Sequence, residues 1–214
     1  MRLTESEQTT LRYIAEGVSD KYAIAKNLAK SYSVVYYAIE KLLKLRLIET
    51  MRSRKGEKNP NLDVKSYGLT LPGLCEALSI HSVSANLEEI DSMVQRWGHF
   101  HFILNNWKFL NEKLPKNEVL ACLQTAASHV GVMWINDLNH KMLDDDSKTL
   151  FARTFFINIL TITPTTQRFF NAEKWIEAIK SNKEFREFII RQLKEDIDKE
   201  RKELAYREKL LLRL

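Results

Sequence analysis

Glycine and proline are scarce in this chain of 214 residues, with six and four copies, and cysteine occurs only twice. So few helix breakers favour long helices and few tight turns. Cys75 and Cys122 stand apart in apolar surroundings and form no CxxC pair, so we expect buried free thiols in a reducing compartment. No run of 18 apolar residues and no apolar N-terminal stretch occurs, so we expect a soluble, cytoplasmic protein with no membrane partner.

The chain also lacks the short motifs on which most enzyme classes depend. It has no glycine-rich phosphate loop, no nucleophile elbow and no HExxH pair. His99 and His101 would point about 200° apart on a helix, so they cannot chelate one metal ion together. The three aspartates at 144–146 lack the glycine and the distant glutamate of a calcium loop, and we expect a solvated turn there. We therefore expect no enzyme activity, no metal and no cofactor.

Positive charge gathers in the N-terminal third of the chain. The net charge is +5 and the isoelectric point is about 9.1. Residues 1–78 hold 13 Lys and Arg against nine Asp and Glu, whereas the rest of the chain holds 20 against 19. A mildly basic protein permits a nucleic-acid partner without requiring one. The N-terminal third is therefore the part to search for a DNA-binding surface.

The first 30 residues predict two helices. Thr4 and Glu7 have the spacing of a capping box, and Gly17 is placed to end the helix that they begin. Ser19 and Asp20 are expected to cap a second helix. The apolar positions of that helix are Tyr22, Ile24, Ala25 and Leu28.

The stretch 31–44 is the one around which this part of the chain is organised. Its apolar residues at 35, 39 and 42 fall on one helix face, and the hydroxyl of Ser31 or Ser33 is expected to cap the first turn. The opposite face suits phosphates and base edges in a major groove. An amphipathic helix with a tolerant surface is the alternative. The candidate DNA-binding residues are Tyr32, Ser33, Tyr36, Tyr37, Lys41 and Lys44.

Two stretches of alternating apolar and polar residues follow, at 47–52 and 62–69, and predict two strands. We expect a bulge in the second stretch. Cations at the tip of this hairpin would reach the phosphate backbone or the minor groove, where counterion release is a main source of affinity. A loop that is merely solvated is the alternative. The cations are Arg52, Arg54, Lys55 and Lys58.

Residues 31–49 resemble the recognition helix and first wing strand of winged helix-turn-helix transcriptional regulators. The PadR group is the closest in pattern, and the MarR group is similar. In many relatives a glycine stands where this chain has Arg46, so we expect the third helix to end without a left-handed residue. The PadR group also usually has glycine at the position of Lys21. The residues that carry the likeness are Tyr22-Ala23-Ile24, Val35-Tyr36, Ala38-Ile39, Leu42, Leu47-Ile48-Glu49 and Tyr67–Gly73.

From residue 86 the pattern is helical nearly to the end. The tryptophans could line an apolar ligand pocket, but an ordinary aromatic core is the preferred interpretation, so a small-molecule effector stays unproven. The tryptophans are Trp97, Trp107, Trp134 and Trp175. We expect a helix over 71–78 and then a hinge at 80–85. Further helices are expected over 86–97, 100–114, 150–162 and 184–214, with Pro115 ending the second of them. Two more helices are expected to begin after the caps Asn117 and Asn171.

The last helix has an apolar position every seven residues. A strict seven-residue repeat marks a helix that packs along a partner helix. The second apolar position of the repeat begins with Leu193, but its next two members are Glu200 and Arg207. These charged residues argue against a long autonomous coiled coil. We expect this helix to dock partly on its own domain and partly on a second subunit; a charged surface helix is the alternative. The candidate dimerisation residues are Ile190, Leu193, Ile197, Leu204 and Leu211.

Together these patterns predict a mainly α protein with two domains. Residues 1–79 would form a winged helix-turn-helix of three helices and a two-stranded wing, and residues 80–214 an all-helical domain for dimerisation and effector sensing. The expected function is a transcriptional regulator that binds double-stranded DNA as a homodimer, with the third helix in the major groove and the wing on the backbone. The alternative is a winged-helix module for protein–protein interaction.

Overall fold

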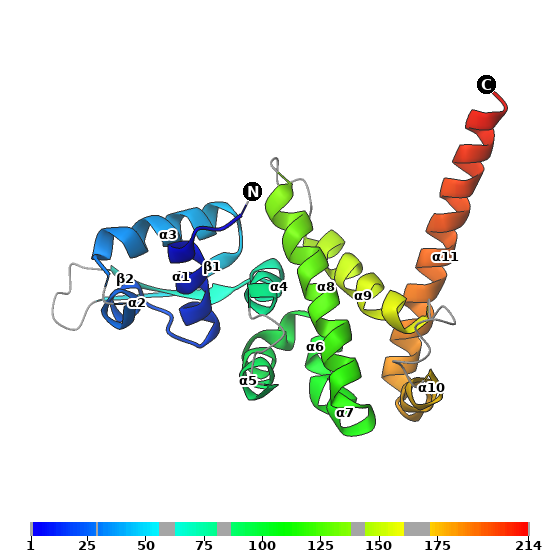
Figure 1. Ribbon diagram of the computed structural model, residues 1–214, viewed down its shortest axis with the longest axis horizontal. Coiled ribbons are helices and arrows are strands. Elements are labelled where there is room, and N and C mark those ends of the chain that lie inside the picture. The colour runs from blue at the N-terminus through cyan, green and yellow to red at the C-terminus, as the bar shows by residue number, and fades with distance from the viewer. Residues whose placement is uncertain are drawn as a thin grey trace.

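The computed structural model describes residues 2–28, 30–55, 63–80, 87–137, 144–160 and 172–213. The fold is mainly helical with one small antiparallel sheet, as the sequence predicts. Figure 1 shows three helices and the sheet at one end, a group of helices in the middle and a long helix that projects away at the other end. Every helix within the described residues is too short or too polar to cross a lipid bilayer.

The first three helices are α1 (Glu5–Ala15), α2 (Lys21–Leu28) and α3 (Tyr32–Lys44). The capping box is confirmed, because the Thr4 N–H donates to Glu7 Oε2 at 2.8 Å and Thr4 Oγ1 accepts from the Glu7 N–H at 3.4 Å. Asp20 Oδ1 accepts from the N–H groups of Tyr22 and Ala23 at 3.0 and 2.9 Å, so Asp20 caps α2. Local capping signals therefore fix where α1 and α2 begin.

Helices α1 and α3 end in the same way, with a left-handed residue after the last turn. Gly17 has φ 96° after α1, and Arg46 has φ 54° after α3. The Arg46 N–H bonds to Leu43 O at 2.9 Å and the Leu47 N–H to Leu42 O at 3.0 Å, which is a Schellman motif. The expectation that α3 closes without a left-handed residue is wrong, because an arginine takes that conformation despite its steric cost.

The sheet consists of β1 (Ile48–Lys55) and β2 (Asp63–Leu69), paired antiparallel from Ile48 opposite Leu69 to Lys55 opposite Asp63. The bulge lies in β1, where Met51 is the extra residue between Thr50 and Arg52. The expectation of a bulge in the second strand is therefore wrong. Ser19 O accepts from the Tyr67 N–H at 2.8 Å, so the turn before α2 pairs with the outer edge of β2, a contact that the sequence did not predict.

The remaining helices are α4 (Leu71–Ile80), α5 (Leu87–Trp97), the 3-10 turn η1 (Gly98–Phe100), α6 (Phe102–Asn105), α7 (Trp107–Lys113), α8 (Lys116–Asn136), α9 (Asp144–Leu160), α10 (Ala172–Ser181) and α11 (Lys183–Leu211). The single helix expected over 100–114 is wrong. His101 is extended, and its Nδ1 accepts from the Ile103 N–H at 3.2 Å, which begins a new helix.

Two expected helix starts also differ. The aspartates at 144–146 form the first turn of α9, not a free turn, since carboxylates are favourable at a helix N-terminus. Helix α8 begins at Lys116 directly after Pro115, so Asn117 lies inside the helix and does not cap it. Of the expected hinge at 80–85, Ile80 is the last residue of α4, and residues 81–85 lie outside the described residues, as does the expected cap at Asn171. In contrast, Asn182 Oδ1 accepts from the Phe185 N–H at 3.1 Å and caps α11.

One continuous hydrophobic core runs from Leu3 to Ile189. Helix α4 packs on α8, and α8 packs on α9, in the middle of the molecule (Figure 1). Trp97 Nε1 on α5 donates a hydrogen bond of 2.8 Å to the carbonyl oxygen of Ala15, the last residue of α1. Trp97 thus satisfies a carbonyl that has no partner within α1. The domain boundary at residue 79 stays a prediction, and the core is shared by the chain on both sides of it.

Candidate nucleic-acid interface

The buried face of α3 agrees with the sequence pattern. Val35, Ile39 and Leu42 are fully buried against the core of the first three helices. Ser31 occupies the cap position, but its hydroxyl makes no capping bond and lies 3.0 Å from Ser33 Oγ. The expected serine cap is therefore right in position and wrong in its hydrogen bond. The apolar stripe, and not the cap, fixes which side of α3 faces solvent.

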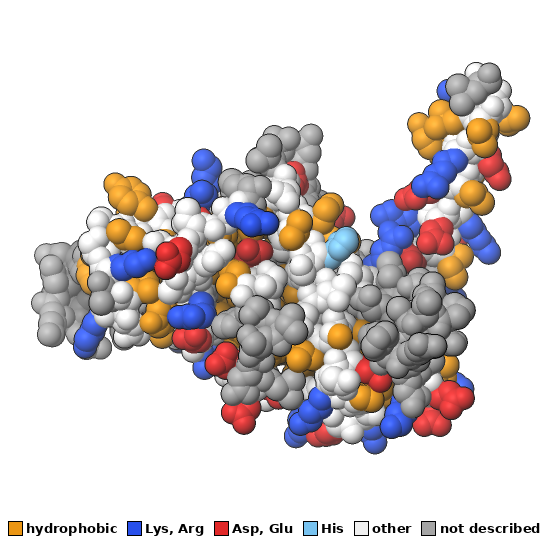
Figure 2. Space-filling model, viewed as in Figure 1, with side chains coloured by type: hydrophobic (Ala, Val, Ile, Leu, Met, Phe, Trp, Pro, Cys, Tyr) orange, Lys and Arg blue, Asp and Glu red, His pale blue; other side chains and the backbone are white. Residues whose placement is uncertain are grey.

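The predicted reading residues lie on the exposed side of α3. Tyr37 is the most exposed of the three tyrosines among them, at 71%, and Tyr36 is 41% exposed. Ser33 and Lys44 are exposed on the same side, because residues four and seven apart share a helix face. Hydrophobic side chains, a class that includes tyrosine, stand on the surface over α3 in Figure 2.

Four tyrosines and a lysine form one surface cluster, which we call the tyrosine cluster. The rings of Tyr22 and Tyr32 are stacked with centroids 4.8 Å apart, and those of Tyr36 and Tyr37 meet edge-on at 5.8 Å. Lys21 Nζ lies 5.2 Å from the Tyr32 centroid and 5.5 Å from that of Tyr36, which is cation–π geometry. A hydrogen bond with Tyr32 is the main reason why the pKa of Tyr22 is raised.

Lys21 and Tyr22 were not among the candidate DNA-binding residues that the sequence predicted. The helical pattern placed Tyr22 in the core of α2, and that interpretation is wrong because its side chain is exposed beside α3. The signal in the sequence was a lysine followed by a tyrosine, Lys21 and Tyr22, at the start of α2, which packs on the tyrosine-rich helix α3. Only the packing of α2 on α3 brings the two sets of side chains together.

Charge on α3 is mixed. Lys41 Nζ lies 3.5 Å from Glu7 Oε1, so this lysine leans toward α1 and part of its charge is balanced there. Glu40 is exposed on the same side as Tyr36 and Tyr37. Burial raises the pKa of Tyr67, and the negative charge of the Glu40 carboxylate adds to that rise. Lys44 thus carries the exposed positive charge at the C-terminal end of this face.

The hairpin carries further positive charge. Arg52 on β1 and Lys65 on β2 are exposed, and Lys65 was not among the predicted residues. Arg54 and Lys55 belong to β1, but their side chains, like the whole of Lys58, lie outside the described part of the chain. The described hairpin therefore contributes two exposed cations, which point to opposite faces of the sheet because Arg52 pairs with Ser66 and Lys65 with Ser53.

Helix α11 leaves the body of the molecule part-way along its length (Figure 1). Phe185 and Ile189 are buried on its own domain and Leu193 is partly buried. The heptad positions that follow are exposed, from 47% at Ile197 to 69% at Leu211. Hydrophobic side chains are visible along the projecting part in Figure 2. The described chain therefore leaves four of the predicted dimerisation residues exposed on this one helix, namely Ile190, Ile197, Leu204 and Leu211.

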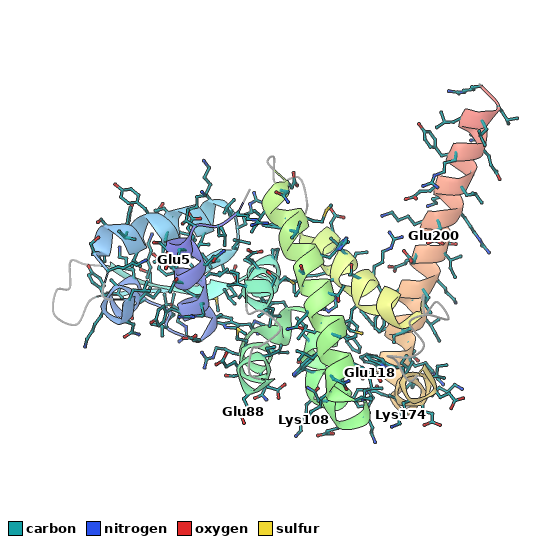
Figure 3. All side chains as sticks on the ribbon, in the orientation of Figure 1. Glu5, Glu88, Lys108, Glu118, Lys174 and Glu200 are labelled. Carbon is teal, nitrogen blue, oxygen red and sulfur yellow. The ribbon has the colours of Figure 1, made fainter. Side chains whose placement is uncertain are left out.

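The point where α11 departs is held by ion pairs with α9. Arg153 Nε lies 2.9 Å from Asp196 Oδ1, and Arg153 Nη2 lies 3.9 Å from Glu200 Oε1. Glu200 marks this point on α11 in Figure 3. A cavity of about 310 Å³ adjoins it between α9 and α11, lined in part by Phe156 and Leu193. No tryptophan lines this cavity.

The four tryptophans belong to the core. Trp107 Nε1 donates to Asp91 Oδ1 at 2.5 Å and Trp175 Nε1 to Glu118 Oε2 at 2.7 Å. The indole N–H of Trp134 bonds to a backbone carbonyl, as that of Trp97 does. Figure 3 shows Glu118 on α8 facing the region of α10. Every indole N–H therefore has a partner in the protein, which favours the aromatic core over a ligand pocket.

Within the described ranges, no three His, Cys, Asp or Glu side chains come together as a metal site would need. Cys75 and Cys122 are buried free thiols, as predicted, and burial raises both pKa values. No protein-family model matches the chain, and no curated protein matches it significantly. The geometry of α3 and the hairpin is therefore what bears on function.

Proposed function

We propose that this chain is a transcriptional regulator of the winged helix-turn-helix type that binds double-stranded DNA. The observation that carries the proposal is the exposed face of α3, where Ser33, Tyr36, Tyr37 and Lys44 lie together opposite a fully buried stripe. Three helices followed by an antiparallel hairpin, in this order, agree with the winged-helix likeness of residues 4–78.

In this proposal α3 enters the major groove and the hairpin is the wing. An α-helix fits the major groove, and its N-terminal residues contact base edges. Arg52 and Lys65 on the hairpin, with the predicted Arg54, Lys55 and Lys58, would neutralise phosphates. Such contacts provide affinity without sequence information, whereas the side chains of α3 provide specificity.

We also propose a homodimer formed through α11. Most helical stability in proteins comes from packing of an apolar face and not from the helix propensity of the residues. The heptad residues Leu204 and Leu211 lack such packing within the described chain, and Ile197, which lines the cavity between α9 and α11, is 47% exposed. A second copy of α11 would bury them, and the two-fold symmetry of the dimer would match a palindromic DNA site.

The rival proposal is a module for protein–protein interaction. Tyrosine is common at protein interfaces because it combines a large apolar ring with a polar hydroxyl, and the tyrosine cluster fits that description. The net positive charge of residues 1–78 and the exposed cations of the hairpin favour DNA. Neither feature is needed for a contact led by tyrosines.

Selection of bound sequences from random double-stranded DNA with the purified full-length protein tests the proposal. We expect enrichment of one palindromic sequence, and a loss of that enrichment in the Tyr37→Ala variant. Tyr206→Ala is the matched control, because Tyr206 is 65% exposed on α11, far along the chain from α3. Failure of the wild-type protein to enrich any duplex would contradict DNA recognition.

A further inference from the structure

The first two turns of α3 have an unusual set of exposed side chains. Residues 32–40 read Tyr-Ser-Val-Val-Tyr-Tyr-Ala-Ile-Glu and contain no Arg, Lys, Asn or Gln. The buried positions among them are Val35, Ala38 and Ile39. What remains on the surface is aromatic, aliphatic or hydroxylic, apart from the single carboxylate of Glu40.

This composition limits what the helix can read in a major groove. Guanine is usually read by the paired donors of Arg or Lys, and adenine by the amide of Asn or Gln. None of these side chains is present in the part of a recognition helix that contacts base edges. A carboxylate such as that of Glu40 is also unfavourable beside guanine, which presents two acceptors there. Two major-groove features remain, the N4 amino group of cytosine, from which a carboxylate accepts a hydrogen bond, and the C5-methyl group of thymine. Only the methyl group suits the aromatic and aliphatic side chains that make up most of this surface.

We propose that α3 recognises thymine methyl groups, so that the half-site of the DNA is rich in A·T pairs. This inference rests on the proposed function and adds the class of base that is read. Tyr37 is the main candidate for the contact, because its ring is the most exposed in the tyrosine cluster. Ser33 and the tyrosine hydroxyls supply single hydrogen bonds, which tolerate several bases.

The tyrosine cluster holds these rings in place before DNA binds. Tyr36 lies edge-on against Tyr37 at 5.8 Å, and Lys21 Nζ lies 5.5 Å from the Tyr36 centroid. Such contacts restrict the side-chain rotamers, and restriction in the free protein lowers the entropy cost of binding. Lys21 also brings a positive charge to the edge of the cluster, where a phosphate would approach. The cluster therefore combines an apolar reading surface with a single cation.

The test replaces thymidine by deoxyuridine in the selected duplex, which removes only the methyl groups and keeps every hydrogen-bonding atom. We expect the wild-type protein to bind the deoxyuridine duplex at least about fivefold more weakly, as loss of a base contact predicts. The Tyr37→Ala variant should bind the two duplexes within about twofold of each other, since the contact is already lost. Tyr37→Phe keeps the ring and should keep the discrimination, and Tyr206→Ala is the surface control.

Three results would overturn the inference while leaving DNA binding intact. The first is equal affinity of the wild-type protein for the thymidine and deoxyuridine duplexes. The second is a selected site whose constant positions are G·C pairs. The third is equal affinity of the wild-type protein for the selected duplex and for one of its separated strands, with no effect of the methyl groups on either. The proposed function itself fails in a different way, namely when no duplex is bound in a salt-dependent manner. Because Tyr37 is largely exposed, its substitution leaves the fold intact, and circular dichroism checks this.

Discussion

The indole N–H of Trp134 on α8 donates a hydrogen bond of 2.7 Å to the carbonyl oxygen of Leu45, the residue that ends α3. Both groups are buried, and the carbonyls of the last turn of a helix have no partner within that helix. A side chain from the helical part of the chain thus completes the end of the proposed recognition helix. The position of α3 therefore depends on α8.

Replacement of Trp134 by phenylalanine should destabilise the protein by about 1–3 kcal/mol, because the buried Leu45 carbonyl loses its donor. Loss of ring volume adds to this cost. Urea unfolding followed by circular dichroism measures it. Tyr206→Phe, on the exposed part of α11, should change the free energy of unfolding by less than about 0.5 kcal/mol. Equal stability of the Trp134 variant and the wild type would show that the bond contributes nothing.

Arg46→Gly should stabilise the protein by roughly 0.5–1 kcal/mol. Arginine pays a steric cost at φ 54°, and glycine does not, although glycine loses more backbone entropy on folding. Lys44→Gly is the matched control, because Lys44 is helical and glycine there should cost up to about 1 kcal/mol. A destabilised Arg46→Gly protein would mean that the arginine side chain makes a contact worth more than the strain.

We expect the protein to lose stability on acidification because of the buried imidazole of His101. Burial lowers the pKa of this imidazole to about 4, from an ordinary 6.5, and the bond between Nε2 and Lys148 O only partly opposes that shift. The folded protein therefore holds the neutral form. Above pH 6.5 this group adds no pH dependence, and between pH 6.5 and 4 only the unfolded chain takes up the proton. We expect a loss of up to about 3 kcal/mol across that window.

His101→Asn removes this titration and keeps an oxygen that can accept from the Ile103 N–H. The variant should be less stable at neutral pH but should lose less on acidification than the wild type. His129→Asn is the control, because His129 is exposed on α8. Urea unfolding at a series of pH values measures the difference. A wild type and a His101→Asn variant with parallel pH curves would assign the acid sensitivity to other groups.

We expect the homodimer proposed to form through α11 to dissociate when Leu204 and Leu211 are both changed to glutamate. Both side chains are more than half exposed on the projecting part of α11, so their substitution should leave the fold intact. Light scattering measures the mass. Ile176→Glu, at an exposed position on α10, should leave the dimer unchanged. A double variant that stays dimeric would place the subunit contact on another surface.

Local signals in the sequence were sufficient for much of the fold. The capping box at Thr4 and the cap at Asp20 depend on residues close in sequence, and the periodicity of α3 depends on one helix alone. The wrong expectations depend on tertiary contacts. Tyr22 was placed in the core because α2 has only eight residues, too few for the pattern to fix its buried face, and its packing on α3 turns the ring outward.

The break at His101 and the left-handed Arg46 show the same limit in another form. Neither residue is itself the glycine or proline that usually marks such a place, although Gly98 lies three residues before His101. At His101 a side-chain nitrogen accepts the N–H that would continue the helix. At Arg46 the return of the chain into β1 imposes the φ value. Such features follow from the whole fold, so one sequence alone does not reveal them.

The salt dependence of duplex binding tests the central proposal most directly. The affinity of the full-length protein for the selected duplex is measured by fluorescence anisotropy at increasing salt concentration. We predict that log K falls linearly with log [salt], with a slope near −0.9 for each phosphate contact, and that Arg52→Ala makes the slope shallower by about one unit. An affinity that does not change with salt would contradict DNA binding through the hairpin and α3, and would favour a protein partner for the tyrosine cluster.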